Sequence, residues 1–229
     1  MMGQDRSNLF EKNIFATMPE GIRPGGLMLT ERLVDCCNFQ NGAKVVDVGC
    51  GTGSTVQYLR DVWNLDASGV DLSAVLLERG KERRMDLPVV QSPGEDLPFV
   101  DHSVDGVLAE CSLSVMRSVS KVLAEINRIL IPGGKLGITD LYALDESCCN
   151  STCHPSGVLN YNEIVQVLLD HGFEIMVFED QSKLLKEFIA GFIMEYGSTD
   201  ELWHCVGMEK TDKKINKVGY YLLIAKKCS

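Results

Sequence analysis

From residue 43 onward, short apolar runs alternate with longer segments in which apolar residues recur every three or four positions. The short runs have the length and composition of buried strands, and the longer segments have the period of amphipathic helices. Strands are predicted at 44–47, 66–70, 88–91, 104–110, 134–140, 174–179 and 219–225. Helices are predicted between them at 54–63, 74–82, 117–131, 162–171 and 182–196. This alternation predicts an α/β fold with a mainly parallel sheet that helices cover on both faces.

The first 42 residues follow a different pattern. Two helical pieces flank the glycine-rich stretch at 21–26, and Thr30 is placed to cap a helix over 31–37. We interpret residues 1–42 as a helical lid or flank, and residues 43–229 as the main domain.

The composition suits one globular domain, because 45% of the 229 residues are hydrophobic. No apolar run approaches the roughly 20 residues of a membrane span, and the polar start MMGQDRSNLFEKN lacks a signal core. We therefore expect a cytoplasmic protein with no membrane partner. Lys and Arg total 22 against 32 Asp and Glu, a net charge of -10 that would repel nucleic acid. The nine cysteines, an odd number, are expected to be reduced.

The segment KVVDVGCGTGS at 44–54 is the most informative part of the chain. A buried strand passes directly into a loop with glycine at every second position, Gly49, Gly51 and Gly53, and then into a helix. Glycine lets a ligand lie against the backbone, and a helix N-terminus presents unpaired N–H groups behind the loop. The spacing is neither that of a dinucleotide-binding G-x-G-x-x-G loop nor that of a P-loop.

Together with later segments, this loop resembles the first motif of the class I S-adenosylmethionine-dependent methyltransferases. The matching segments are VVDVGCGTG at 45–53, GVDLS at 69–73, GEDLPF at 94–99, SVDGVLAE at 103–110 and RILIPGGKLGITD at 128–140. The chain looks nearest to the ubiquinone/menaquinone-type and arsenite methyltransferase-like groups. The resemblance implies a Rossmann-like sheet of seven strands with an antiparallel last strand, and S-adenosyl-L-methionine as the cofactor.

The resemblance also implies where the cofactor is held. The methionine part would lie against the loop at 49–51, the ribose on Asp71, and the adenine between Leu72 and the backbone at 94–95. A carboxylate at the end of the second strand can accept both ribose hydroxyls. Pro93 stands where relatives often carry an acidic residue for the adenine amino group, so this contact is expected to differ. The expected cofactor residues are Asp47, Gly49, Cys50, Gly51, Gly53, Asp71, Leu72, Gly94, Glu95 and Glu110.

The segment DESCCNSTCHP at 145–155 gathers Cys148, Cys149, Cys153 and His154 within seven residues. Four interpretations are open: a metal site, a disulfide, a thiol site for a substrate, or a chance cluster in a loop. Structural zinc loops usually separate paired ligands by about two to four residues, and the second pair comes from another segment. Adjacent ligands therefore fit zinc poorly, and no metal is expected.

Substrate-contacting residues are expected beyond the carboxyl ends of the strands. The resemblance to arsenite methyltransferases makes Cys111 and Cys153 candidate catalytic thiols, because soft thiolates suit trivalent arsenic. The neighbouring Cys36 and Cys37 depart from that pattern, since adjacent helical residues point about 100° apart. The further candidates for substrate binding are Arg23, Glu110, Cys148, Cys149 and His154.

Two functions are therefore expected. The first is methyl transfer from S-adenosylmethionine to a small-molecule acceptor, with a thiophilic acceptor, arsenite-like or sulfur, held by loop cysteines as one form of it. Methyl transfer is an in-line displacement, so alignment of the reactants matters more than a large set of catalytic residues. The alternative is a non-catalytic thiol- or metal-binding protein on a methyltransferase scaffold. The sequence leaves the acceptor atom and the oligomeric state open.

Overall fold

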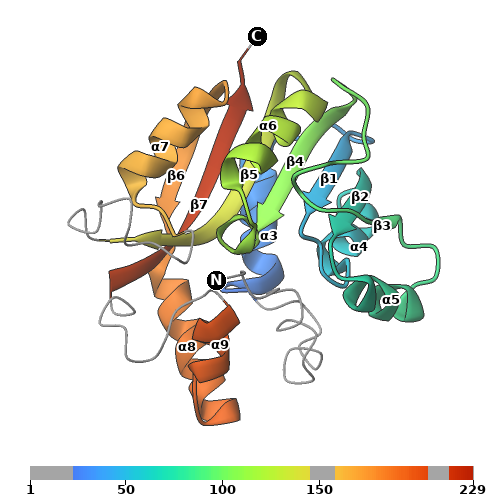
Figure 1. Ribbon diagram of the computed structural model, residues 1–229. Helices are drawn as coiled ribbons and strands as arrows, with labels where there is room; N and C mark the ends of the chain where they lie inside the picture. Colours follow the sequence, from blue (N-terminus) through green and yellow to red (C-terminus); the bar gives the residue numbers. More distant parts are fainter. Residues whose placement is uncertain (1–22, 145–157, 206–216, 229) are drawn as a thin grey trace.

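The computed structural model describes residues 23–144, 158–205 and 217–228, and a seven-stranded sheet forms its centre (Figure 1). The strand order is β3-β2-β1-β4-β5-β7-β6. The strands are β1 (Lys44–Val48), β2 (Asp66–Asp71), β3 (Val89–Gln91), β4 (Val104–Glu110), β5 (Leu130–Ala143), β6 (Phe173–Asp180) and β7 (Val218–Lys227). Strands β1 to β5 pair in parallel, whereas β7 is antiparallel to β5 and to β6. The predicted Rossmann-like sheet with an antiparallel last strand is confirmed.

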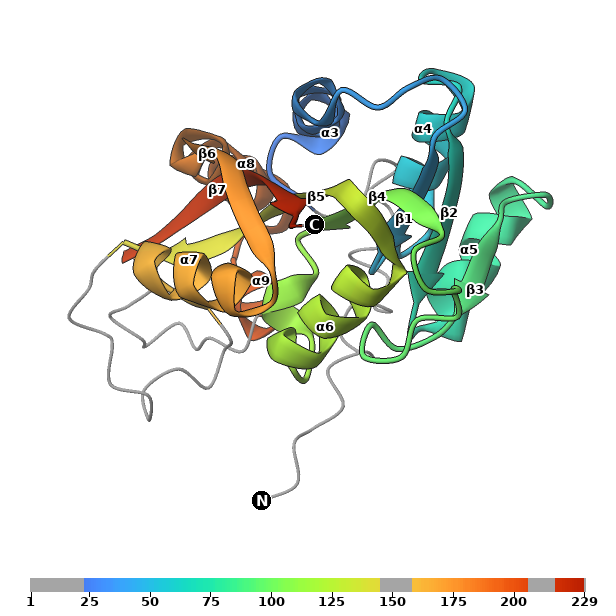
Figure 2. The same cartoon turned by 90° about the horizontal axis from the view of Figure 1, so that it is seen from above.

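Helices cover both faces of this sheet (Figure 2). They are α3 (Gly26–Cys37), α4 (Ser54–Asp61), α5 (Ala74–Arg83), the short 3-10 helix η1 (Leu113–Val115), α6 (Val119–Ile129), α7 (Tyr161–Asp170), α8 (Ser182–Tyr196) and α9 (Asp200–Cys205). The sequence pattern predicts all of the longer ones but not α9. Strand β5 also begins at Leu130, several residues before the predicted strand.

Alternating strand residues divide the core into two clusters, as the two-residue period of a strand requires. Val46 and Val107 pack in the cluster that contains residues of α6 and α7. Val45 and Leu108 pack in the cluster that contains residues of α3, α4 and α8. Because all the parallel strands run the same way, the segments after β1, β2, β4 and β5 meet at one edge of the sheet.

Helix α3 belongs to the region expected to form a lid, and it packs against β5 and β7 through Leu33 and Val34. The predicted capping role of Thr30 is wrong. The helix begins at Gly26, after Gly25 in the left-handed conformation, so Thr30 lies inside it. Its hydroxyl is instead directed to Glu110 on β4, a contact between residues far apart in the chain. The domain boundary at residue 42 stays a prediction.

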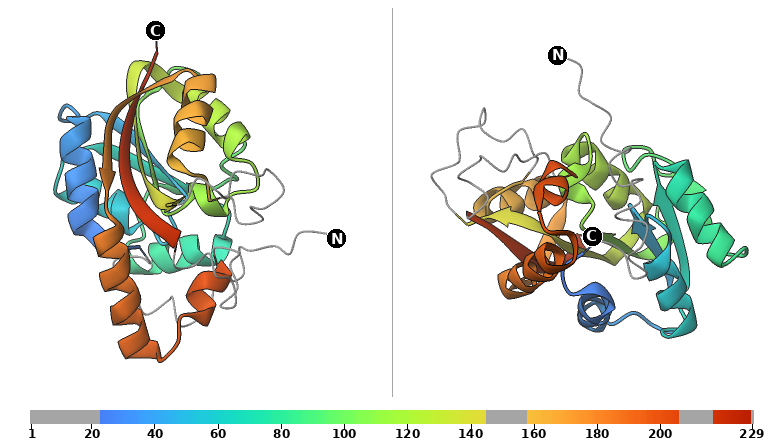
Figure 3. Two further views of the ribbon diagram at one scale, coloured as in Figure 1. Left: turned by 90° about the vertical axis from the view of Figure 1, so that its left-hand side faces the viewer. Right: turned by 90° about the horizontal axis from the view of Figure 1, so that it is seen from below.

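Helix α8 starts beside β7, where Leu185 is buried, and then projects with α9 beyond one end of the sheet (Figure 3). Across the described ranges, every helix is too short or too polar to span a bilayer.

Two helical glycines provide a test of the packing around the loop after β1. In α5, a Cβ at Gly80 would lie 2.3 Å from the carbonyl oxygen of Thr52, whereas in α8 a Cβ at Gly191 would meet nothing within 4 Å. Gly80→Ala should lower the free energy of unfolding by about 1–3 kcal/mol, because α5 must shift. Gly191→Ala should raise it by up to about 1 kcal/mol through helix propensity. Urea unfolding measures both, and equal effects would contradict the close packing of α5 on this loop.

Candidate active site

The loop after β1 is built from left-handed backbone. Gly49, Gly51 and Gly53 have φ angles of 83°, 54° and 71°, which residues with a Cβ rarely adopt. At Gly49 a Cβ would also lie 2.5 Å from the Cβ of Ser112, so the segment after β4 approaches the loop closely. At Gly51 a Cβ would meet nothing within 4 Å, so this glycine faces open space. The loop therefore presents bare backbone to a ligand at its middle glycine.

Hydrogen bonds to the end of β2 fix the conformation of this loop. The amides of Gly49 and Cys50 donate to one carbonyl of β2 at 2.8 and 3.0 Å. The amide of Gly51 donates to Oδ2 of Asp71 at 2.8 Å. The other Asp71 oxygen accepts the amide of Ser73 at 2.8 Å. Asp71 thus stands half-buried beside the loop, at the position where the sequence predicts a ribose-binding carboxylate.

The carboxylate of Glu110 is buried at the end of β4 and is held from three directions. The hydroxyl of Thr30 lies 2.9 and 3.1 Å from its two oxygens, and Thr55 of α4 donates to Oε1 at 3.1 Å. Nε of Arg23 lies 3.3 Å from Oε2, and Nη2 of Arg23 donates to Thr30 at 2.8 Å. Two of the five residues proposed for substrate binding, Arg23 and Glu110, therefore form a buried ion pair with each other.

Asp47 lies in β1 beside this pair and is also buried. Burial, together with the charges of Glu110 and Asp71, raises the pKa of Asp47 to about 8, although the positive charge of Arg23 opposes the shift. Asp47, Asp71 and Glu110 thus place three carboxyl groups around the glycine loop. At neutral pH the Asp47 carboxyl is protonated and Glu110 is paired with Arg23, so the carboxylate of Asp71 is the group that favours a cationic ligand at the loop.

Cys111 follows Glu110 directly and has a left-handed backbone with φ 55°. Burial and the negative charge of Asp140 raise the pKa of the Cys111 thiol to about 12, against the effect of a hydrogen bond with Tyr220. The group is therefore a thiol at neutral pH, whereas nucleophilic cysteines and soft-metal ligands act as thiolates.

The other candidate thiols, Cys148, Cys149 and Cys153, and also His154, lie outside the described residues. Within the parts of the chain that are described, no group of three His, Cys, Asp or Glu side chains could hold a metal ion.

Leu72, Gly94 and Glu95 are the residues expected around an adenine. Leu72 is 43% exposed directly after β2. A Cβ at Gly94 would lie 2.9 Å from Sδ of Met116. The Glu95 side chain accepts the amide of Ser118 at 3.1 Å, just before α6. The Glu95 carboxylate is therefore engaged at that helix, and the adenine contact of the 94–95 backbone stays a prediction.

The segment after β4 contributes two neighbours of the loop: Ser112, which lies in the stretch at 110–114 where the wall of the substrate site is expected, and Met116, which is not among the predicted site residues. Oγ of Ser112 donates at 2.7 Å to the carbonyl of Val48, the residue that precedes Gly49. The Met116 methyl carbon would lie 3.6 Å from a Cβ at Gly49 and 3.2 Å from a Cβ at Gly94. Their position beyond the carboxyl end of a parallel strand is the one sequence signal that points to them.

Comparisons with known proteins agree with this geometry. Residues 46–138 match the family model described as a methyltransferase domain. The demethylmenaquinone methyltransferase of Renibacterium salmoninarum is 35% identical over 108 residues, 47% of this chain and 45% of the relative. The crystal structure of the cyclase SpnF has a TM-score of 0.69 and 26% identity, over 87% of this chain and 80% of its own. Phosphoethanolamine N-methyltransferase 2 of Haemonchus contortus, in complex with phosphomonomethylethanolamine and S-adenosylhomocysteine, has a TM-score of 0.77 and 21% identity, over 99% of this chain and 61% of its own.

The fold and the match of residues 46–138 to a methyltransferase domain support the class I S-adenosylmethionine-dependent methyltransferase that the sequence predicts. The chain spans about half the length of curated relatives such as the demethylmenaquinone methyltransferases. A cyclase shares the fold, so the fold alone does not fix the reaction.

The buried carboxyl of Asp47 predicts a pH effect on stability. Its pKa is about 8 in the folded chain, against about 3.9 for an exposed Asp, so between these values the folded state holds a proton that the unfolded state has lost. The contribution of Asp47 to the free energy of unfolding should therefore fall as pH rises, by up to about 1.4 kcal/mol per pH unit within that window. Urea unfolding at pH 5 and pH 8 should show a larger loss of stability for the wild type than for Asp47→Asn. Parallel losses in the two proteins would contradict the raised pKa.

Proposed function

We propose that this chain is an S-adenosylmethionine-dependent methyltransferase that acts on a small-molecule acceptor. The observation that carries the proposal is the open, bare backbone at Gly51 beside Asp71, with the buried carboxyls of Asp47 and Glu110 close by. S-adenosylmethionine has a sulfonium and an ammonium group, so it suits a loop that lies beside the carboxylate of Asp71. Its ribose offers two hydroxyl donors to a carboxylate.

Individual residues are assigned to parts of the cofactor on this basis. The glycine loop at 49–51 takes the methionine part, Asp71 the ribose, and Leu72 with the 94–95 backbone the adenine. When bound, the cofactor supplies the methyl group. The chain contributes by aligning the acceptor with that group and by keeping water out, because an in-line displacement depends on alignment.

The ribose assignment leads to a prediction about two acids at opposite ends of β2. Asp71→Ala should weaken binding of S-adenosylmethionine at least about ten-fold, since two charge-assisted hydrogen bonds are lost. Asp66→Ala, at the start of the same strand, removes an exposed pair with Arg60 and should leave the affinity unchanged. Isothermal titration calorimetry measures both variants. If Asp71→Ala binds as tightly as the wild type, the ribose lies elsewhere.

A thiophilic acceptor, arsenite-like or sulfur, is the more specific form of the proposal. It is supported by the place of Cys111, directly after β4 and beside the Arg23–Glu110 pair. The raised pKa of this thiol opposes it, because binding of arsenic must first displace the thiol proton. The cluster formed by Cys148, Cys149, Cys153 and His154 enters this version of the proposal from sequence alone.

A methyl-transfer screen tests the nature of the acceptor. With arsenite, thiols, amines and phenols as acceptors, formation of S-adenosylhomocysteine is the readout. A thiophilic acceptor predicts turnover with arsenite that is lost in Cys111→Ser and retained in Cys228→Ser, an exposed cysteine near the chain end. If amines or phenols are methylated and Cys111→Ser leaves this turnover intact, the thiophilic acceptor is rejected and the proposed methyltransferase activity is retained.

The alternative proposal is a non-catalytic thiol- or metal-binding protein that keeps this scaffold. The same screen separates the two proposals, since a scaffold protein forms no S-adenosylhomocysteine with any acceptor class. We further propose a small molecule and not nucleic acid as the partner, because the net charge of -10 repels phosphates. The cytoplasm is the proposed compartment, since nine cysteines, an odd number, suit a reducing environment.

A further inference from the structure

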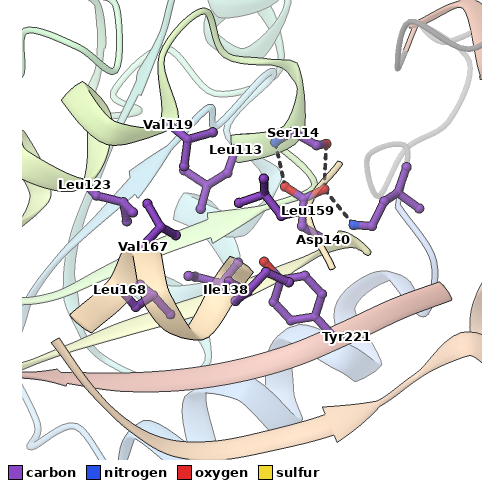
Figure 4. Close-up of a pocket in the computed structure, with 12 residues that line it drawn as sticks. Leu113, Ser114, Val119, Leu123, Ile138, Asp140, Leu159, Val167, Leu168 and Tyr221 are labelled. Carbon is purple, nitrogen blue, oxygen red and sulfur yellow. Dashed lines mark hydrogen bonds between the residues drawn. The ribbon is translucent and has the colours of Figure 1, made fainter. Parts of the chain in front are cut away.

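A small cavity of about 30 Å³ lies where the segments at the carboxyl ends of β4 and β5 meet α6 and α7 (Figure 4). Most of its wall is apolar, including Val119 and Leu123 of α6, Val167 and Leu168 of α7, and Ile138 of β5. Three side chains with polar atoms, Ser114, Asp140 and Tyr221, also line it. The volume admits one or two non-hydrogen atoms, so the cavity can take one small group of a larger molecule.

Asp140 brings a buried negative charge to this cavity. Its side chain is 2% exposed, and its carboxylate accepts the amide and the hydroxyl of Ser114 at 2.9 and 2.6 Å and the amide of Leu141 at 2.7 Å. All of these donors are neutral. Among the residues that the structure describes, no lysine or arginine forms an ion pair with Asp140. Within the described part of the chain, the carboxylate is therefore held in place without a compensating positive charge.

The neighbouring side chains respond to this charge. Together with burial, the Asp140 charge raises the pKa values of Cys111, Tyr220 and Tyr221. These groups are consequently neutral at physiological pH and add no further negative charge. Burial raises the pKa of Asp140 itself, although its hydrogen bonds oppose the shift. A cation that entered the cavity would remove part of the desolvation penalty that Asp140 bears.

We propose that this cavity binds the ammonium group of an amine-bearing methyl acceptor, with Asp140 as its counter-ion. An ammonium is a compact cation with a single non-hydrogen atom, so it matches both the volume and the charge of the cavity. The apolar walls suit the carbon atoms attached to it. The cation is the anchor of the acceptor, and the methylated atom is not assigned. That the bound amine is a methyl acceptor rests on the proposed function, whereas the binding of an amine in this cavity does not.

The position of the cavity fits this role. Ser112 contacts the carbonyl of Val48 at the base of the glycine loop, and two residues later Ser114 holds Asp140. One short segment after β4 thus borders the proposed cofactor loop on one side and the cavity on the other. An acceptor anchored by Asp140 would lie next to the methyl donor.

The test uses two probes of nearly the same shape and different charge. Benzylamine is a cation at pH 7, and benzyl alcohol is neutral. With ¹³C-labelled leucine and valine methyl groups, benzylamine should shift the NMR signals of Leu123 and Val167, and it should bind at least about ten-fold more tightly than benzyl alcohol. Equal affinities, or shifts confined to methyl groups outside the cavity, would overturn the proposal.

Two variants separate charge from space. Asp140→Asn should reduce the affinity for benzylamine to that for benzyl alcohol, and an unchanged affinity would refute the role of Asp140 as counter-ion. Val167→Leu adds one methylene to the cavity wall and should weaken both probes, which keeps the proposal testable if Asp140→Asn does not fold. Its control is Val90→Leu, since Val90 lies on β3 outside the cavity and is 49% exposed. If the two probes bind the Val167→Leu variant as tightly as the Val90→Leu variant, their binding site lies outside the cavity.

Calorimetry with S-adenosylmethionine on the same samples distinguishes this inference from the proposed function. Binding of benzylamine without binding of S-adenosylmethionine would support the amine site and reject the methyltransferase. Binding of S-adenosylmethionine without binding of benzylamine would reject the amine site and support the proposed methyltransferase.

Discussion

The buried carboxylate of Glu110 is the constraint on which the rest of the site depends. A carboxylate removed from water must be compensated by hydrogen bonds and opposite charge, or it costs several kcal/mol. Here the compensation comes from Thr30 on α3, from Thr55 on α4 and from Arg23 ahead of α3. One side chain thus joins the N-terminal segment, the helix after the glycine loop and the end of β4.

The same edge of the sheet holds a second buried carboxylate in different surroundings. Glu110 has a guanidinium beside it, whereas Asp140 on the neighbouring strand is held by neutral donors alone among the described residues. The first carboxylate serves mainly to assemble the fold around the glycine loop. The second has no cationic partner among the described residues and lies beside an apolar cavity, which is the arrangement expected of a binding site for a cation. Of these two carboxylates on neighbouring strands, Glu110 therefore has a structural role and Asp140 a role in recognition.

Much of the fold could be predicted because it depends on local pattern. Apolar period and turn residues placed the strands and the longer helices, and the glycine loop with Asp71 identified the class. The failures concern contacts between distant residues. Thr30 has the sequence of a helix cap, yet its hydroxyl bonds to a carboxylate 80 positions away. Glu95 has a motif position near the cofactor, yet its side chain holds the start of α6. For Ser112 and Met116 the only sequence signal is their position after β4, and the cavity beside Asp140 forms only when α6, α7 and β5 are packed together.

Methyl transfer at this site requires that the open backbone at Gly51 and the carboxylate of Asp71 hold the cofactor. A crystal structure of the chain with S-adenosylhomocysteine tests this most directly. We predict that the amino-acid part of the ligand lies against the loop at 49–51 and that the ribose hydroxyls lie about 2.6–3.2 Å from the oxygens of Asp71. A ligand bound with its ribose away from Asp71, or at another surface of the molecule, would contradict the assignment of this loop as the methyl-donor site.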